Sequence, residues 1–215
     1  MEVFVGLGWS VELIVCDNNS SDNTPEIARL AGAKVVFEPV NQIARARNTG
    51  AAAATGEWLV FVDADSHPTA ELFADVAEHI QSGKCLAGGA TVKLSGRHPL
   101  AHCVAGLWNW TSRVTCWLAG SFIFCEATAF RAVGGFSQEL FVTEEIDFSK
   151  RLKVHVRKVG RKIVILHRYP LLTSDRKVQL YTLREHGRFL LRLALGRRQV
   201  LSDRRACHVW YDGRR

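Results

Sequence analysis

A chain of 215 residues is long enough to bury one substantial hydrophobic core and is marginal for two domains. Its apolar fraction of 47% and charged fraction of 23% are ordinary for a globular protein, which argues against a disordered or fibrous class. No uninterrupted apolar run approaches the ~18 residues that a membrane-spanning helix needs, so we do not expect a bilayer span.

The net charge of +7 is concentrated near the C-terminal end. Residues 184–215 contain nine Arg and three acidic residues, a balance of +6, and the preceding residues carry 19 Lys and Arg against 18 Asp and Glu. This charge suits an anionic partner, either membrane phospholipid or nucleic acid, and a solvated basic helix face is the equal alternative. The apolar residues of a helical pattern in the same tail are Leu183, Phe189, Leu190, Leu193 and Leu195.

Strand-like and helix-like segments alternate over the first part of the chain. Residues 11–16 are a β-branched run that predicts a strand, and the turn-rich DNNSSDNT follows it. Thr24 and Pro25 are typical of an N-cap and a first helical position. Residues 34–37 predict a short strand, and residues 43–54, rich in Ala and Arg, predict a helix.

The alternation continues with a strand at residues 58–62 and an amphipathic helix at residues 69–82. It predicts an α/β fold whose sheet is parallel at least in this half. In such sheets ligands gather at the carboxyl ends of the strands. Two predicted strands end in aspartates there, Asp17 and Asp63.

The second half is less regular. Residues 86–93 and 162–166 predict strands, and Glu144, Glu145 and Asp147 open a predicted helix. Between them lies an apolar stretch, residues 101–130. We interpret it as buried or interfacial structure because polar residues interrupt it, namely Asn109, Arg113 and Glu126.

Asp63 and Asp65 follow the predicted strand in WLVFVDADSHP. Carboxylates this close raise each other's pKa unless a positive group lies between them. Mg²⁺ or Mn²⁺ prefers oxygen ligands and is often held by few carboxylates, with substrate phosphates completing its shell. A polar turn after a strand is the equal alternative. A phosphatase of the haloacid dehalogenase type is disfavoured, because its DxDx(T/V) pattern meets His67 at the fifth position.

Two other segments carry polar side chains suited to a nucleotide. Asp17, in DNNSSDNT, could accept hydrogen bonds from a base or ribose, although Asp, Asn and Ser also bond their own backbones in turns. Arg47 and Asn48, in ARARNTG, could contact the nucleotide or its phosphates, or they could belong to a solvent-facing helix.

Four blocks together resemble the family 2 glycosyltransferases of the GT-A fold, in that family's order and spacing, over roughly residues 11–155. They are VELIVCDNNSSDNT, ARARNTGAAAATGEWLVFVDADS, GSFIFCEATAFRAVGGF and TEEIDFSKRL. The resemblance implies an α/β fold with a GT-A-like, Rossmann-type mixed sheet flanked by helices. It would form a single domain over residues 1–180, followed by a basic, amphipathic, helical extension at residues 181–215.

The resemblance also implies roles for individual residues. Asp17 matches the family's nucleotide-binding aspartate. Asp63 and Asp65 match its DxD motif, with Asp65 as direct metal ligand and Asp63 nearer the ribose or the metal. TEE at residues 143–145 matches the family's TED motif, whose final acid is the catalytic base, so that role falls on Glu145. An inverting transfer needs such a base to take the proton of the acceptor hydroxyl.

Two features depart from the family pattern. The family usually has Asp where this chain has Glu145, and catalysis is sensitive to a displacement of ~1 Å, so Glu144 and Asp147 remain alternatives for the base. All three acids could also simply favour a helix N-terminus. Residues 1–10 are too few for the strand and crossover that family members place before IVCDNNSSDNT. We therefore expect that unit to be truncated or degraded, with a strand edge exposed.

The resemblance therefore implies an inverting glycosyltransferase that uses a UDP- or GDP-sugar and Mg²⁺ or Mn²⁺. The acceptor would be a glycan or lipid-linked sugar in bacterial cell-surface synthesis. With scattered cysteines and no secretory signal, we expect a cytoplasmic protein, peripheral at the inner membrane face through its basic tail, with no nucleic-acid partner. The alternatives are a catalytically silent nucleotide-binding or scaffold module, and a nucleotidyltransferase of related fold.

Overall fold

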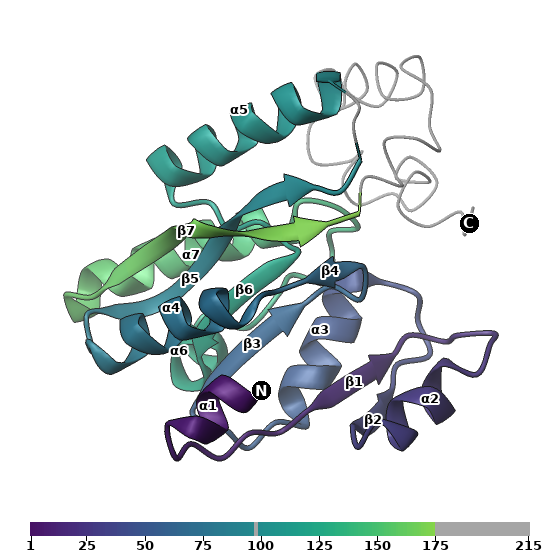
Figure 1. The fold of residues 1–215 in the computed structure, drawn as a ribbon. Helices are drawn as coiled ribbons and strands as arrows, with labels where there is room; N and C mark the ends of the chain where they lie inside the picture. Colours follow the sequence, from purple (N-terminus) through teal and green to yellow (C-terminus); the bar gives the residue numbers. More distant parts are fainter. Residues whose placement is uncertain (97–98, 175–215) are drawn as a thin grey trace.

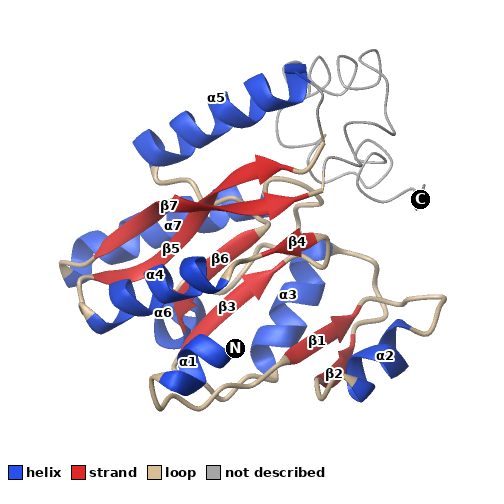
Figure 2. Cartoon of the chain, in the orientation of Figure 1, coloured by secondary structure: helices blue, strands red, loops and turns tan. Residues whose placement is uncertain are grey.

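The computed structural model describes residues 1–96 and 99–174, and Figure 1 shows the path of the chain. Helices lie on both faces of a central sheet (Figure 2), which confirms the predicted α/β class. The basic tail predicted as a helical extension lies outside the described residues. In chain order the elements are α1 (Glu2–Gly6), β1 (Ile14–Asp17), α2 (Thr24–Leu30), β2 (Lys34–Phe37), α3 (Ile43–Ala52), β3 (Trp58–Val62), β4 (Ser66–His67), α4 (Ala70–Gln81), β5 (Cys85–Leu94), α5 (Pro99–Thr115), β6 (Phe122–Glu126), α6 (Ala127–Ala132), α7 (Glu144–Val159) and β7 (Lys162–Thr173).

The strands form two sheets. β1 and β2 pair in parallel by themselves, and the other five strands have the order β3-β6-β5-β7-β4. β5 and β7 are parallel, whereas β6 runs antiparallel to both β3 and β5. The prediction of a parallel sheet in the first half is therefore right for β1 and β2 and wrong for β3. Alternating strands and helices indicate the fold class, but they do not say which strand returns to pair with β3.

The five-stranded sheet separates two hydrophobic cores, as β6 illustrates. Ile123 and Cys125 pack into a core with α3, α6 and α7, while Phe122 and Phe124 pack into a core with α1 and α4. All four side chains are fully buried. Successive residues of a strand point to opposite faces, so an apolar run buried on both sides lies between two helical layers.

The N-terminal residues form a short helix instead of a strand. Phe4 of α1 stacks on Trp9 at 5.7 Å between ring centroids and meets Phe73 of α4 edge-on at 5.5 Å. Among the described strands β3 pairs with β6 alone, so its other edge is open. The expectation that the first strand–helix unit is truncated stays a prediction.

β7 is longer than the predicted strand, because it continues beyond Leu166 to Thr173. The extension includes Pro170, a residue type that is common in turns, and several of its residues are exposed. A sheet edge tolerates proline, and β7 has a neighbour on that side only at its end, where β4 pairs with Leu172 and Thr173. None of the described helices is long and apolar enough to cross a membrane.

Candidate active site

The DADS segment forms a tight turn at the carboxyl end of β3. The backbone N–H of Asp63 donates to the carbonyl of Ser121 at 3.1 Å, and the N–H of Ser66 donates to the carbonyl of Asp63 at 3.0 Å. The N–H of Ser174 donates to the carbonyl of Asp65 at 3.2 Å, which ties the end of β7 to the same turn. Asp63 and Asp65 therefore lie together at the sheet end, and the Asp63 side chain is 40% exposed.

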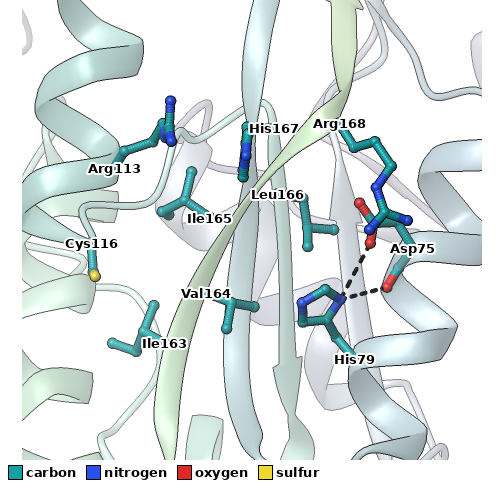
Figure 3. A pocket seen from close by; sticks show the side chains of 10 residues that line it. All are labelled: Asp75, His79, Arg113, Cys116, Ile163, Val164, Ile165, Leu166, His167 and Arg168. Atoms are coloured by element: carbon teal, nitrogen blue, oxygen red, sulfur yellow. Dashed lines mark hydrogen bonds and ion pairs between the residues drawn. The ribbon is translucent and has the colours of Figure 1, made fainter.

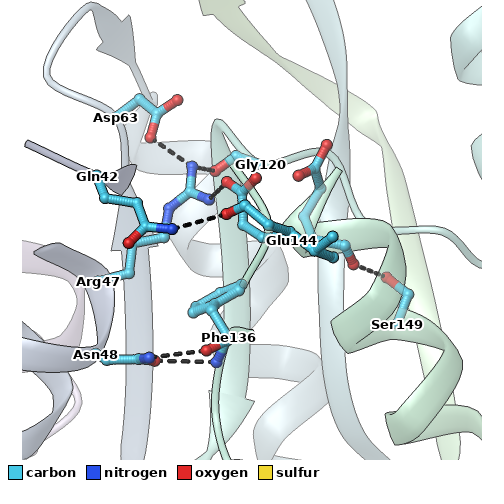
Figure 4. A network of polar contacts seen from close by, with 10 residues as sticks. Gln42, Arg47, Asn48, Asp63, Gly120, Phe136, Glu144 and Ser149 are labelled. Carbon is cyan, nitrogen blue, oxygen red and sulfur yellow. Dashed lines mark hydrogen bonds and ion pairs between the residues drawn. The ribbon is translucent and has the colours of Figure 1, made fainter. Parts of the chain in front are cut away.

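Arg47 of α3 connects this turn to the start of α7, as Figure 4 shows. Its Nη2 lies 2.9 Å from Oδ1 of Asp63, and its Nη1 lies 2.7 Å from Oε1 of Glu144. Nη2 also donates to the carbonyl of Gly120 at 2.8 Å. The Arg47 side chain is only 10% exposed. We name Arg47, Asp63 and Glu144 the ion triad. The predicted contact of Arg47 with a nucleotide stays a prediction.

The two carboxylates stabilise the charged form of Arg47. Burial disfavours the charged guanidinium, but the charges of Asp63 and Glu144 outweigh it and raise the pKa of Arg47 above its ordinary value. Gly120 keeps the approach clear, since a Cβ there would come within 3.0 Å of Nη2 of Arg47. The triad therefore needs a small residue at this point of the loop.

Two amides on the same side hold the loop that precedes α7. Nε2 of Gln42 donates to the carbonyls of Gln138 at 2.8 Å and Leu140 at 3.0 Å. The Asn48 amide binds the backbone of Phe136 twice, donating to its carbonyl at 2.8 Å and accepting from its N–H at 2.9 Å. Together with the triad, these bonds fix the start of α7 against α3. Sequence reasoning assigned no role to Gln42 and expected Asn48 near a nucleotide.

The acidic residues at the start of α7 have different environments. Glu144 is buried and paired with Arg47, and Asp147 pairs with Arg151 at 2.8 Å one turn further along. Burial, together with the adjacent charge of Glu144, raises the pKa of Glu145 to about 8 against the opposing charge of Arg47. The raised pKa favours the protonated form of Glu145 near neutral pH.

The backbone around Glu145 is fixed by a serine one turn later. Oγ of Ser149 donates to the carbonyl of Glu145 at 2.6 Å and accepts from the N–H of Leu118 at 3.0 Å. Ser149 is fully buried. The preceding Thr143 adopts a left-handed conformation with φ of 62°, which is uncommon for a β-branched residue. Such backbone conformations persist where the surrounding structure enforces them.

Asp17 lies in the other sheet, at the end of β1. It is buried, and its Oδ1 accepts the N–H of Ser20 at 3.0 Å, while its carbonyl accepts the N–H of Glu38 at 2.9 Å. β1 and β3 belong to separate sheets, so the expectation that Asp17 and Asp63 end neighbouring strands is wrong. The turn reading of DNNS accounts for the Asp17 carboxylate contact in this structure, and its nucleotide role stays a prediction.

A cavity of about 640 Å³ lies elsewhere, along β7 (Figure 3). The lining side chains at its polar side are Asp75 and His79 of α4, whose carboxylate and Nδ1 are 3.4 Å apart. Cys116 and Arg113 lie across the strand. No predicted site residue lines this cavity. We therefore place the candidate active site at the triad and the DADS turn, where the polar residues converge.

Comparison with known proteins gives a family similarity over part of the chain. Residues 10–110 match the family model described as Glycosyl transferase family 2. An uncharacterized glycosyltransferase of Mycobacterium tuberculosis (strain ATCC 25618 / H37Rv) is 32% identical over 101 residues, which are 47% of this chain and 42% of that protein. The chain spans less than half the length of the curated relatives that it matches.

Solved structures share the fold at low sequence identity. S. aureus TarS 1-349 in complex with UDP has a TM-score of 0.59 at 20% identity, covering 76% of this chain and 51% of that chain. The mannosyltransferase PcManGT of Pyrobaculum calidifontis, in complex with GDP-Man and Mn²⁺, has a TM-score of 0.59 at 19% identity, covering 92% and 55%. These similarities establish the GT-A fold. The family match covers residues 10–110, so this part of the chain is similar to the family 2 glycosyltransferases.

Proposed function

We propose that this protein transfers a sugar from a UDP- or GDP-sugar to a hydroxyl acceptor, with inversion at the anomeric carbon. One observation carries the proposal: Arg47 joins the aspartate turn after β3 to the acidic start of α7. A sugar transfer needs an anchor for the donor diphosphate and a base for the acceptor. The DADS turn offers the first and Glu145 the second.

The DADS turn suits a divalent cation. No group of three or more His, Cys, Asp or Glu side chains gathers into a metal site among the described residues, so protein side chains alone do not complete a coordination shell there. Mg²⁺ is commonly held by one or two carboxylates plus substrate phosphates, and Asp63 and Asp65 match that pattern. Asp65 would be the direct ligand, with Asp63 shared between the ion and Arg47. A bound Mg²⁺ or Mn²⁺ would stabilise the departing nucleoside diphosphate.

Glu145 is the proposed base. A catalytic base works best when its pKa is near the operating pH, and burial raises the pKa of this carboxyl to about 8. Once deprotonated, it would take the proton of the acceptor hydroxyl as that oxygen attacks the anomeric carbon. The ion pairs that occupy Glu144 and Asp147 leave Glu145 as the better candidate of the three. Ser149 and the loop amides would keep it in position.

The proposed substrates rest on the ligands of proteins with the same fold, and the proposed location rests on the charge of the sequence. Neighbours of the same fold were solved with UDP and with GDP-Man and Mn²⁺, so we propose a donor of that class, bound partly by Asp17. We propose a glycan or lipid-linked acceptor and a cytoplasmic protein at the inner membrane face, because the sequence after residue 183 carries +6 of the net charge.

A panel of UDP- and GDP-sugars, assayed for donor hydrolysis and transfer with Mn²⁺, tests the proposal. We expect metal-dependent turnover that Asp65→Ala abolishes and that Glu145→Gln lowers by roughly 10²–10⁴-fold. Glu71→Gln on the exposed start of α4 is the matched control and should retain activity. A comparable loss in Asp147→Asn but not in Glu145→Gln would move the base to Asp147.

The same assay separates the two other functions. Nucleotide binding without turnover across the panel would mean a silent nucleotide-binding or scaffold module. Release of diphosphate from a nucleoside triphosphate and a sugar phosphate would mean a nucleotidyltransferase. Neither outcome is compatible with the proposed sugar transfer.

A further inference from the structure

Helix α5 has one face fixed against the body of the protein. It packs on β5 and β7, and its residues Ala101 and Ser112 are buried. The Asn109 amide binds the backbone of Val92 twice, accepting from its N–H at 2.9 Å and donating to its carbonyl at 2.8 Å. These two bonds set the rotation of the helix about its axis. The residues of the opposite face are therefore held outward.

The outward face is apolar. Its large side chains recur at spacings of three or four residues, so they form one continuous stripe along the helix. We name them the α5 stripe: Val104 (60% exposed), Leu107 (65%), Trp110 (64%) and Val114 (65%). Single exposed apolar residues are ordinary, but an exposed contiguous row commonly marks a binding surface. In Figure 1 α5 lies at the outer end of the molecule, opposite α2.

The charge around the stripe favours an anionic partner. α5 contains no acidic residue, and Arg113 is exposed next to Val114. The N–H of Ser95 donates to the carbonyl of Thr173 at 3.0 Å, so the chain enters the α5 region beside the point where β7 ends. In sequence, the strongly basic residues 184–215 follow β7.

We propose that the α5 stripe docks on the surface of an anionic lipid bilayer. Amphipathic helices bind in the interfacial plane through apolar side chains, and anionic lipids attract the flanking cations. Trp110 suits this position, since tryptophan is enriched at membrane–water interfaces. A stripe on one helix is narrow for a standard protein–protein interface, which needs some 20–30 residues from each partner. The inference deepens the proposed location of the enzyme by naming the surface that meets the membrane.

Vesicle sedimentation of the full chain tests this surface without any donor or acceptor. The vesicles contain phosphatidylcholine alone or phosphatidylcholine with phosphatidylglycerol. The test variant is the double substitution Leu107→Ser and Trp110→Ser. The matched control is Ile27→Ser with Leu30→Ser, two side chains of α2 that are 65% and 88% exposed. All four residues lie on the surface, so each variant should fold, as circular dichroism will verify.

We expect wild type and the α2 control to bind the anionic vesicles equally, and the α5 variant to bind at least about tenfold more weakly. Higher salt should weaken wild-type binding, because it screens the charges. Equal binding of the α5 variant and wild type would overturn the proposal. So would wild-type self-association in analytical ultracentrifugation that the α5 variant loses, without vesicle binding, because a second copy would then be the partner. Binding is measured without turnover, so failure of the proposed enzymatic function would show separately in the donor assay.

Discussion

Two pairs of carboxylates in this protein have the same chemistry and opposite environments. Asp63 and Asp65 sit on a turn after β3, where solvent reaches Asp63. Glu144 and Glu145 begin α7, where Glu144 is buried and burial raises the pKa of Glu145 to about 8. The two pairs therefore suit different roles: the pair on the turn after β3 can meet a cation, while Glu145 at the start of α7 can hold and exchange a proton.

Arg47 is the connection between the two pairs. It contacts one oxygen of Asp63 and one of Glu144 directly, and its charge also acts on Glu145. Burial and the adjacent charge of Glu144 outweigh the charge of Arg47 at Glu145 and favour the protonated form of that carboxyl. The following predictions test this division, beginning with the largest expected effect.

Removing the Arg47 side chain should lower the free energy of unfolding more than removing the loop amides. Arg47→Met would leave Glu144 buried without its partner, which typically destabilises a protein by about 3–5 kcal/mol. Urea unfolding measures the free energy of unfolding. Arg29→Met, which breaks the exposed pair of Arg29 and Glu26 on α2, is the control and should cost less than about 1 kcal/mol.

A second substitution shows whether Arg47→Met loses stability through the unpaired charge of Glu144 or through lost packing of the arginine side chain. Glu144→Gln in the Arg47→Met background removes the unpaired charge and should recover part of the lost stability. If the double variant is no more stable than Arg47→Met, the loss comes from the packing of the arginine side chain, and the electrostatic account of the triad is wrong.

The loop amides should matter less, because they are neutral. Asn48→Ala would leave the N–H and carbonyl of buried Phe136 without their partner, at a cost of about 1–3 kcal/mol. Asn41→Ala removes an exposed bond from Asn19 and should be nearly neutral. Urea unfolding compares the two variants. Equal stability of both would show that Asn48 does not hold the loop before α7.

Local patterns in the sequence predicted most of the elements of this fold but not how they pair. The short strands at residues 34–37 and 58–62 coincide with β2 and β3, since compact apolar runs bounded by turn residues leave few alternatives. The two-sheet arrangement was missed, because strand partners depend on contacts far apart in the chain. The stretch at residues 101–130 was expected to be buried or interfacial, and α5 is buried on one face only.

The candidate site was predictable to a similar degree. The DADS and TEE motifs located the acidic residues, because their residue types show in a short window. The contacts that organise them join residues far apart in sequence: 88 positions between Asn48 and Phe136, and 97 between Arg47 and Glu144. No local sequence pattern predicts such a bond. The roles of Gln42, Gly120 and Ser149 could therefore be found only in the folded structure.

The last prediction concerns the pH dependence of stability that Glu145 contributes. In the unfolded chain this carboxyl has its ordinary pKa of 4.5, whereas in the folded chain its pKa is about 8. Between these values the folded state holds a proton that the unfolded state has released, so stability is greatest at low pH and falls as the pH rises toward 8. One proton sets an upper limit of about 1.4 kcal/mol per pH unit.

Glu145→Gln isolates this contribution, because glutamine keeps the shape of the side chain and cannot ionise. Urea unfolding from mildly acidic pH to about pH 8 should show a shallower decline for Glu145→Gln than for wild type. Asp65→Asn, on the open turn, should leave the decline unchanged and serves as the control. Parallel curves for wild type and Glu145→Gln would mean that Glu145 is ionised in the folded protein. The two carboxylate pairs would then differ in position alone, and the base would have to be sought on other grounds.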